Sequence, residues 1–257
     1  MPRPDWERFR PPAVIGHHEY GYRSVGSTMD VAWELAEAGA AHGTCVVAGT
    51  QTHGRGRFDR EWVSGDSLLA SVVLRPSAST APLLTIIGCL AVRDAVRELC
   101  GLRCAIKWPN DVQVDGRKLC GVLAEGRIYA TGTTGAGVAV LGIGLNVSLD
   151  VAEHPELAAT ATSLLAETGR SIDLRTAGDA LFASLDAWYG GAEPAALIAR
   201  WREAIDTLGR RVSVRVRGSN ATLSGLAEDV DAAGRLLLRT DDGVLHALDE
   251  GDVTLAG

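Results

Sequence analysis

The pattern of apolar residues changes near residue 208, and this change restricts the fold more than any other feature. Before it, segments with helical periodicity (28–38, 82–99 and two or three more between 158 and 207) alternate with strand-like segments at 20–25, 44–50, 67–74, 104–108 and 136–147. After it come only short strands, at 211–216, 221–229, 236–240 and 244–247. The pattern predicts a large domain of helices and strands at 1–208 and a small all-β module, barrel-like, at 209–257. A module of about fifty residues has little core of its own, so we expect it to pack on the larger domain.

Composition limits the class of protein. Hydrophobic residues make up 46% of the 257 residues, which is enough for a buried core. The net charge of -7 argues against a general nucleic-acid binder, so any phosphate chemistry needs a local basic cluster. The five cysteines include no CxxC pair, the Pro- and Arg-rich arm at 1–16 lacks a secretory signal, and no apolar run could span a membrane. These observations predict a cytoplasmic protein with no membrane segment.

The segment at 51–62 concentrates positive charge. It reads Gln-Thr-His-Gly-Arg-Gly-Arg-Phe-Asp-Arg-Glu-Trp, with glycines alternating with arginines. Glycine allows a close approach of backbone to ligand, and arginine offers forked donors for carboxylate or phosphate. The segment also fits a solvated loop or an RNA-binding patch. It is not a P-loop, because no GxxxxGK[ST] occurs.

Three further segments carry polar residues at predicted strand ends. Lys-Trp-Pro-Asn-Asp at 107–111 ends a strand, which is either a simple turn or a ligand loop. Asp115-Gly116 predicts a hairpin turn, after which Lys118 begins an apolar strand that runs to Glu125. That lysine either reaches solvent or faces a buried anion. Gly-Ile-Gly-Leu-Asn at 142–146 is too short for a dinucleotide fingerprint.

Taken in order, these segments resemble the catalytic core of biotin protein ligases. Residues 27–147 contain the family's Ser-Thr pair, its Gln-x-x-Gly-Arg-Gly-Arg loop, Lys-Trp-Pro-Asn-Asp, Lys-Leu-x-Gly-x-Leu-x-Glu and Gly-Ile-Gly-x-Asn-Val. The resemblance implies an α+β fold: a class II synthetase-like catalytic domain with a mixed or antiparallel sheet, followed by an SH3-like β-barrel. It also implies a two-step reaction, in which biotin and ATP form biotinyl-5'-AMP and biotin then passes to a lysine of a biotin carboxyl carrier domain. Magnesium is expected with ATP.

The resemblance also implies roles for single residues. Arg55, Arg57 and Lys118 would stabilise the joining of the two anions, and Asp111 would orient the carrier lysine. Ser27, Thr28 and Gln51 would bind the ureido ring, Trp62 the adenine face and Asn146 the base edge. The full set expected at biotin is Ser27, Thr28, Met29, Gln51, Arg55, Gly56, Arg57, Lys118, Gly121, Leu123, Gly142 and Gly144. The set expected at ATP is Arg57, Trp62, Lys107, Asn110, Lys118 and Asn146.

The chain departs from the family pattern at two positions. Met29 replaces the usual Asn, and Asp59 replaces a usual Gly of the loop. No winged helix precedes residue 20, so DNA binding is not expected. Lipoate–protein ligase and a non-enzymatic RNA-binding protein are the competing interpretations, and the oligomeric state, monomer or homodimer, stays open.

Overall fold

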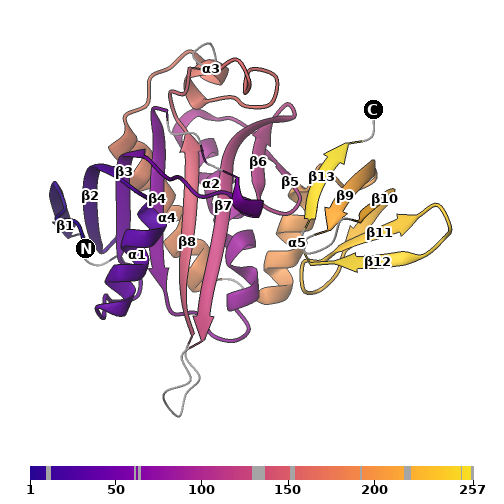
Figure 1. Cartoon of the computed structure of the whole chain (residues 1–257), viewed down its shortest axis with the longest axis horizontal. Coiled ribbons are helices and arrows are strands. Elements are labelled where there is room, and N and C mark those ends of the chain that lie inside the picture. Colours follow the sequence, from indigo (N-terminus) through magenta and orange to yellow (C-terminus); the bar gives the residue numbers. More distant parts are fainter. Residues whose placement is uncertain are drawn as a thin grey trace.

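The computed structural model describes residues 1–9, 13–60, 62, 65–128, 137–150, 154–191, 193–216, 221–249 and 251–255. The described strands form two sheets of eight and five strands, which lie side by side in Figure 1. The helices and the larger sheet come first in the chain, and the smaller sheet comes last, so the α+β fold class is confirmed. None of the described helices is long and apolar enough to cross a membrane.

The large sheet has the strand order β1-β2-β3-β4-β8-β7-β6-β5. Among the described strands of this sheet, β2 and β3 form the one parallel pair, and the other neighbours are antiparallel, so the sheet is mixed as predicted. At the centre, every residue of β4 is buried, which explains why apolar residues occupy both faces of this strand instead of alternating with exposed polar ones. Its strands are β1 (Trp6–Phe9), β2 (His18–Val25), β3 (Cys45–Gln51), β4 (Ser67–Leu74), β5 (Ala105–Lys107), β6 (Asp111–Val114), β7 (Arg117–Ile128) and β8 (Gly137–Asn146).

Helices cover both faces of this sheet (Figure 1). Helix α1 (Thr28–Glu37) packs on β3, β4 and β8 and closes a smaller hydrophobic core. On the opposite face, α2 (Leu84–Cys100) and α4 (Leu174–Gly191) pack on the sheet and on each other, within the larger core. The remaining helices are α3 (Leu164–Thr168), α5 (Pro194–Ala204) and the short 3-10 turns η1 (Arg57–Asp59) and η2 (Ala81–Leu83).

The C-terminal sheet is antiparallel and has the order β12-β11-β10-β9-β13. Its buried residues Val212, Val214, Leu236 and Leu238 belong to the larger core, so the small sheet packs on the larger domain as predicted. The indole N–H of Trp108 also donates to the carbonyl of Gly234 at 3.2 Å. The strands are β9 (Arg211–Val216), β10 (Thr222–Val230), β11 (Leu236–Thr240), β12 (Leu245–Leu248) and β13 (Gly251–Leu255).

Two strands differ from the prediction. The arm at 1–16 was expected to be irregular, but Trp6–Phe9 forms the edge strand β1 on β2. Gly21 of β2 has no side chain, and the Trp6 indole packs into the space that this leaves. A Cβ added at Gly21 would lie 1.8 Å from the indole. Strand β13 was not predicted at all, since its five residues carry little apolar pattern. The hairpin turn is as predicted, with Asp115 and Gly116 at φ of 47° and 77°.

Candidate active site

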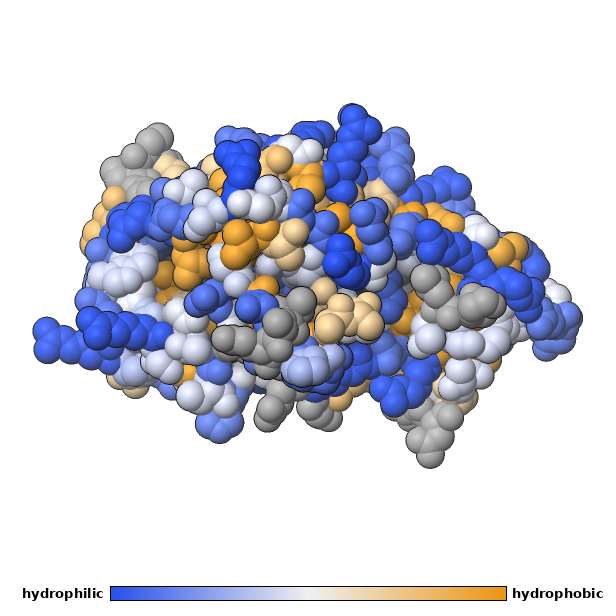
Figure 2. Space-filling view, turned by 90° about the horizontal axis from the view of Figure 1, so that it is seen from above, coloured by the Kyte–Doolittle hydropathy of each residue, from blue (hydrophilic) through white to orange (hydrophobic). Residues whose placement is uncertain are grey.

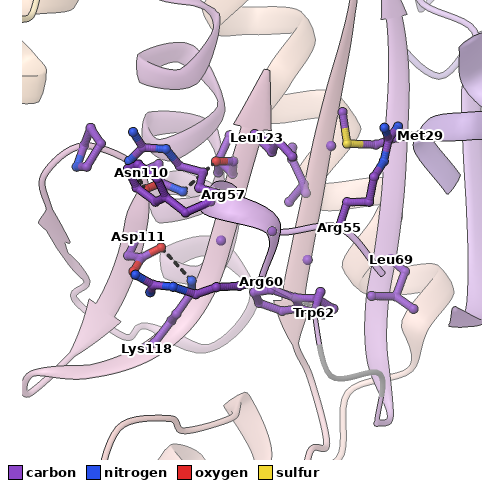
Figure 3. A pocket seen from close by; sticks show the side chains of 18 of the residues that line it. Met29, Arg55, Arg57, Arg60, Trp62, Leu69, Asn110, Asp111, Lys118 and Leu123 are labelled. Atoms are coloured by element: carbon purple, nitrogen blue, oxygen red, sulfur yellow. Dashed lines mark hydrogen bonds and ion pairs between the residues drawn. The ribbon is translucent and has the colours of Figure 1, made fainter. Parts of the chain in front are cut away.

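A pocket opens on the α1 side of the large sheet, where the row of side chains on β8 changes from valine to glycine. Its walls come from the start of α1, the 51–62 segment, the ends of β5 to β8, and β13 of the small sheet (Figure 3). Nearly all the residues predicted for the site therefore lie together. Those lining the pocket are Ser27, Thr28, Met29, Gln51, Arg55, Gly56, Arg57, Trp62, Lys107, Asn110, Asp111, Lys118, Gly121, Leu123, Gly142 and Gly144.

The start of α1 forms the polar end of the pocket. Ser27 is the N-cap of the helix, and its hydroxyl accepts the backbone N–H of Met29 at 3.3 Å. The backbone N–H and hydroxyl of Thr28 both donate to Oε1 of Gln51, at 2.7 and 2.8 Å. The Thr28 hydroxyl also lies 2.8 Å from the hydroxyl of Ser71 on β4. This network fixes the orientation of the Gln51 amide group, so the pocket presents ordered polar groups.

Glycines on β7 and β8 make the floor of the pocket. Gly121 and Gly144 are register partners, and the Trp62 indole rests on both, because an added Cβ would lie 2.8 Å and 2.5 Å from its ring atoms. Gly142 has the same relation to Met29, whose sulfur would lie 2.7 Å from an added Cβ. The floor thus needs glycine for close approach of large side chains. Met29, which stands where an Asn was expected, is buried and gives the pocket an apolar wall.

Arg55 and Arg57 of the 51–62 segment contact different parts of the molecule. Arg55 pairs with Asp30 at 2.9 Å and lies 3.5 Å from Glu125. Arg57 donates to Oδ1 of Asn110 at 3.2 Å and to the carbonyl of Gly251 at 3.3 Å. In Figure 3, Arg55 extends toward Met29 while Arg57 extends toward Asn110, so the two guanidinium groups lie on opposite sides of the pocket.

The same segment docks on the small sheet. Arg60 forms an ion pair with Asp252 of β13, and Asp252 is also 3.5 Å from Arg215 of β9. Phe58 adopts a left-handed backbone (φ 58°), and its ring lies 5.0 Å from the Arg57 guanidinium and 6.0 Å from that of Arg215. The prediction missed Phe58, Arg60 and β13 as parts of the pocket wall. The only sequence signal for Arg60 was the basic character of the 51–62 segment. The prediction made for Asp59 lies outside the described residues, because its side chain is not among them.

Lys118 and Asp111 form an ion pair at the other end of the pocket. Lys118 Nζ lies 2.7 Å from Oδ1 of Asp111 and 5.2 Å from the centre of the Trp62 ring. The backbone of Lys118 is bonded to the segment at 160–162, with its N–H donating to the Thr160 carbonyl at 2.7 Å. This answers the alternative left open by the sequence: the lysine lines a pocket beside an acid and an aromatic ring.

Asn146, predicted at the adenine edge, lies outside the pocket lining. It is buried, and its amide donates to the carbonyls of Thr162 at 2.9 Å and Lys118 at 3.4 Å. Its Oδ1 accepts the Ser67 hydroxyl at 3.3 Å. These bonds occupy the groups that a base would need, so Asn146 here fixes the strand end that carries Lys118.

Cysteine offers no nucleophile among the described residues of the pocket. Cys120 and Cys89 are buried behind the floor, and burial raises the pKa of both thiols. Burial also raises the pKa of the Cys104 thiol to about 12. A thiolate is the reactive form, so burial makes these three thiols poor nucleophiles.

Known protein families and curated proteins are similar to this chain in sequence. Residues 20–146 match the biotin/lipoate A/B protein ligase family, and residues 207–255 match the biotin protein ligase C terminal domain. The chain is 34% identical to the bifunctional ligase/repressor BirA of Bacillus subtilis over 241 residues, which cover 90% of this chain and 72% of that protein. It is 32% identical to the biotin–[acetyl-CoA-carboxylase] ligase of Mycobacterium tuberculosis over 263 residues, covering 91% and 92%.

Solved structures agree in fold. The biotin protein ligase from Aquifex aeolicus in complex with biotin and ATP matches with a TM-score of 0.71 and 25% identity, covering 93% of this chain and 98% of that one. The biotin protein ligase from Leishmania major in complex with biotinyl-5-AMP matches with a TM-score of 0.62 and 25% identity, covering 93% and 99%.

Proposed function

The chain belongs to the biotin protein ligase family, and from this premise we propose that its pocket joins biotin to ATP and passes biotin to a carrier lysine. The observation that carries the proposal is the meeting of three cations, Arg55, Arg57 and Lys118, with an ordered polar group at Thr28 and Gln51 in one pocket. The chain as a whole is acidic, so this local excess of cations suits two anionic substrates.

The polar end of the pocket suits the ureido ring of biotin. A cyclic urea has one acceptor oxygen and two N–H donors, and Ser27, Thr28 and Gln51 together offer both donors and acceptors. Met29 and Leu123 then face the apolar part of the ring and the chain of carbon atoms. The proposed direction of the substrate is therefore ring toward α1 and carboxylate toward Arg57 and Lys118.

The first step brings the biotin carboxylate against the α-phosphate of ATP, and the main obstacle is repulsion between the two anions. A carboxylate oxygen bonds to the α-phosphorus as the bond from that phosphorus to the pyrophosphate oxygen breaks, and pyrophosphate leaves. Fixed cations reduce the repulsion most in this transition state, where the two anions are closest and the phosphorus is pentacoordinate. We assign this role to Arg57 of the 51–62 segment and Lys118 of β7, which both line the pocket. Removing one preorganised donor of this kind costs about 10²–10³-fold in rate.

The adenosine part of ATP is placed at Trp62, whose ring lies on the paired glycines beside Lys118. Lys107 and Asn110 line the phosphate side of the same pocket. Among the described residues, no group of three or more His, Cys, Asp or Glu side chains could hold a metal ion. Magnesium would therefore be held chiefly by ATP oxygens and water, as is usual for this ion.

In the second step the ε-amine of the carrier lysine attacks the anhydride, and AMP leaves. The amine must lose a proton, and Asp111 is the carboxylate that the pocket offers. While Lys118 is paired with Asp111 this carboxylate is occupied, so a phosphate that draws Lys118 away would release it. We propose a biotin carboxyl carrier domain as the acceptor and the cytoplasm as the location, in keeping with the free thiols of all five cysteines.

The deciding experiment gives the purified chain ATP, biotin and a carrier domain, and follows labelling of the carrier lysine by mass. We expect labelling that depends on both substrates and biotin-dependent exchange of pyrophosphate into ATP. Lipoate in place of biotin serves as the control, because one matching family model covers lipoate ligases as well. Exchange with lipoate but not with biotin would refute the proposal.

A further inference from the structure

The guanidinium of Arg55 lies between two carboxylates that belong to neither the loop nor the substrate-binding groups assigned above. Asp30 on α1 is 2.9 Å away, and Glu125 on β7 is 3.5 Å away. The side chains of Arg55, Asp30 and Glu125 are 37%, 57% and 33% exposed, so solvent weakens both pairs. Asp30 therefore has two interactions. It lies in the first turn of α1, where an acidic residue stabilises the helix, and it also pairs with Arg55.

Glu125 is itself held in place from the hydrophobic core. The indole N–H of Trp33 donates to Oε2 of Glu125 at 3.0 Å, which leaves Oε1 toward Arg55. Trp33 is 4% exposed and belongs to the core under α1. The Arg127 guanidinium lies 4.2 Å from the Trp33 ring and forms an ion pair with Glu37. A continuous series of contacts therefore runs from the buried Trp33 through Glu125 to the loop arginine.

We infer that Asp30 and Glu125 are positioning residues for Arg55, an inference that rests on the proposed function. Arg55 stands between Gly54 and Gly56, so its local backbone is weakly restrained by side chains. An arginine has many rotamers, and a cation contributes to catalysis or binding only where it is already fixed. The two carboxylates supply that restraint. Asp30 lies beside one terminal nitrogen of the guanidinium and Glu125 beside the other, and the arginine so held lines the pocket where biotin would bind.

The test measures biotin-dependent pyrophosphate exchange for Glu125→Gln and Asp30→Asn. Each change keeps the shape of the side chain and removes its charge. We expect the KM for biotin to rise roughly threefold to tenfold, equivalent to about 0.6–1.4 kcal/mol, with the KM for ATP changed by less than about twofold. Glu34→Gln is the matched control, because Glu34 of α1 pairs with the N-terminal amine outside the pocket, and its KM values should equal those of the parent enzyme.

A double-variant comparison separates positioning from a general structural effect. If Glu125 acts through Arg55, then Glu125→Gln should add nothing to the loss caused by Arg55→Gln. Trp33→Phe, which removes the donor to Glu125, should show a smaller rise in the KM for biotin at an unchanged Tm. If Trp33→Phe lowers the Tm, the two charge variants still decide the question.

An unchanged or lower KM for biotin in Glu125→Gln would overturn the inference, because the carboxylates would then be neutral or would compete with the substrate for Arg55. Additive losses in the double variant would overturn it as well. A parent enzyme without biotin-dependent exchange would instead refute the proposed function itself, so the two failures are distinguishable.

Discussion

Replacing Lys118 with alanine should abolish most of the first half-reaction. The ammonium group is 35% exposed, lies 2.7 Å from Asp111, and faces the pocket over the Trp62 ring. Losing this fixed cation should lower the rate of adenylate formation by about 10²–10³-fold. A matched change at the neighbouring Arg117, which pairs with Glu167, should leave the rate within about twofold, because Arg117 does not line the pocket.

Part of the loss in Lys118→Ala should come from the partner that it leaves behind. A bare Asp111 carboxylate about 5 Å from a substrate anion would repel it by about 3 kcal/mol at an effective dielectric constant of about 20. Asp111 is 24% exposed, so solvent screening reduces this figure, and we expect about 1.4 kcal/mol. The double variant Lys118→Ala with Asp111→Asn should therefore exchange pyrophosphate roughly tenfold faster than the single variant.

Biotin-dependent exchange of labelled pyrophosphate into ATP measures this step without the carrier protein. The single variant, the double variant and Arg117→Ala are compared at saturating biotin and ATP, after equal Tm values show that all are folded. Exchange by Lys118→Ala at the parental rate would remove the lysine from the reaction. Equal rates for the single and double variants would refute the electrostatic role given to Asp111.

Three further changes test other parts of the pocket. Arg57→Gly should release adenylate, seen as a severalfold rise in biotinylation of an unrelated protein, and no rise would count against closure by this side chain. Gly144→Ala places a Cβ 2.5 Å from the Trp62 indole and should raise the KM for ATP severalfold. Gly126→Ala on β7 is the control, because open space surrounds Gly126, and it should leave this KM unchanged. Equal effects of the two variants would contradict the packing role of Gly144. Asp252→Asn removes the ion pair between β13 and the loop, so trypsin should cut at residues 55–60 faster while the Tm stays within about 4 °C, and an unchanged cleavage rate would exclude the contact in solution.

The parts of the pocket that lie within one motif could be predicted from the sequence. Thr28, Gln51 and Lys118 each come from a segment whose residue types already indicate a ligand site, whereas the hydrogen bonds between Thr28 and Gln51 join two such segments. The hairpin at Asp115-Gly116 was predictable for the same reason, since its backbone angles depend on two adjacent residues.

The parts that depend on contacts between distant segments could not be predicted. Asp252 lies 192 residues after Arg60, and nothing in its surroundings in the sequence marks it as a partner of the loop. The resemblance implied that Asn146 would meet the base edge, but its amide donates to the carbonyls of Lys118 and Thr162, and it lies outside the pocket lining. In both cases tertiary placement, and not residue type, decides what the side chain contacts.

The separation of the two hydrophobic cores has a consequence for how the pocket opens and closes. Helix α1 carries the polar end of the pocket and packs in the smaller core, while α2, α4 and the C-terminal sheet share the larger one. A partial opening that releases α1 need not disturb the larger core, so the amides of α1 should exchange with solvent through local rather than global unfolding. Because a substrate bound at Thr28 favours only the closed form, biotin should slow that exchange in proportion to its saturation. Hydrogen exchange of the α1 amides would then report biotin binding as an increase in the local stability of this helix.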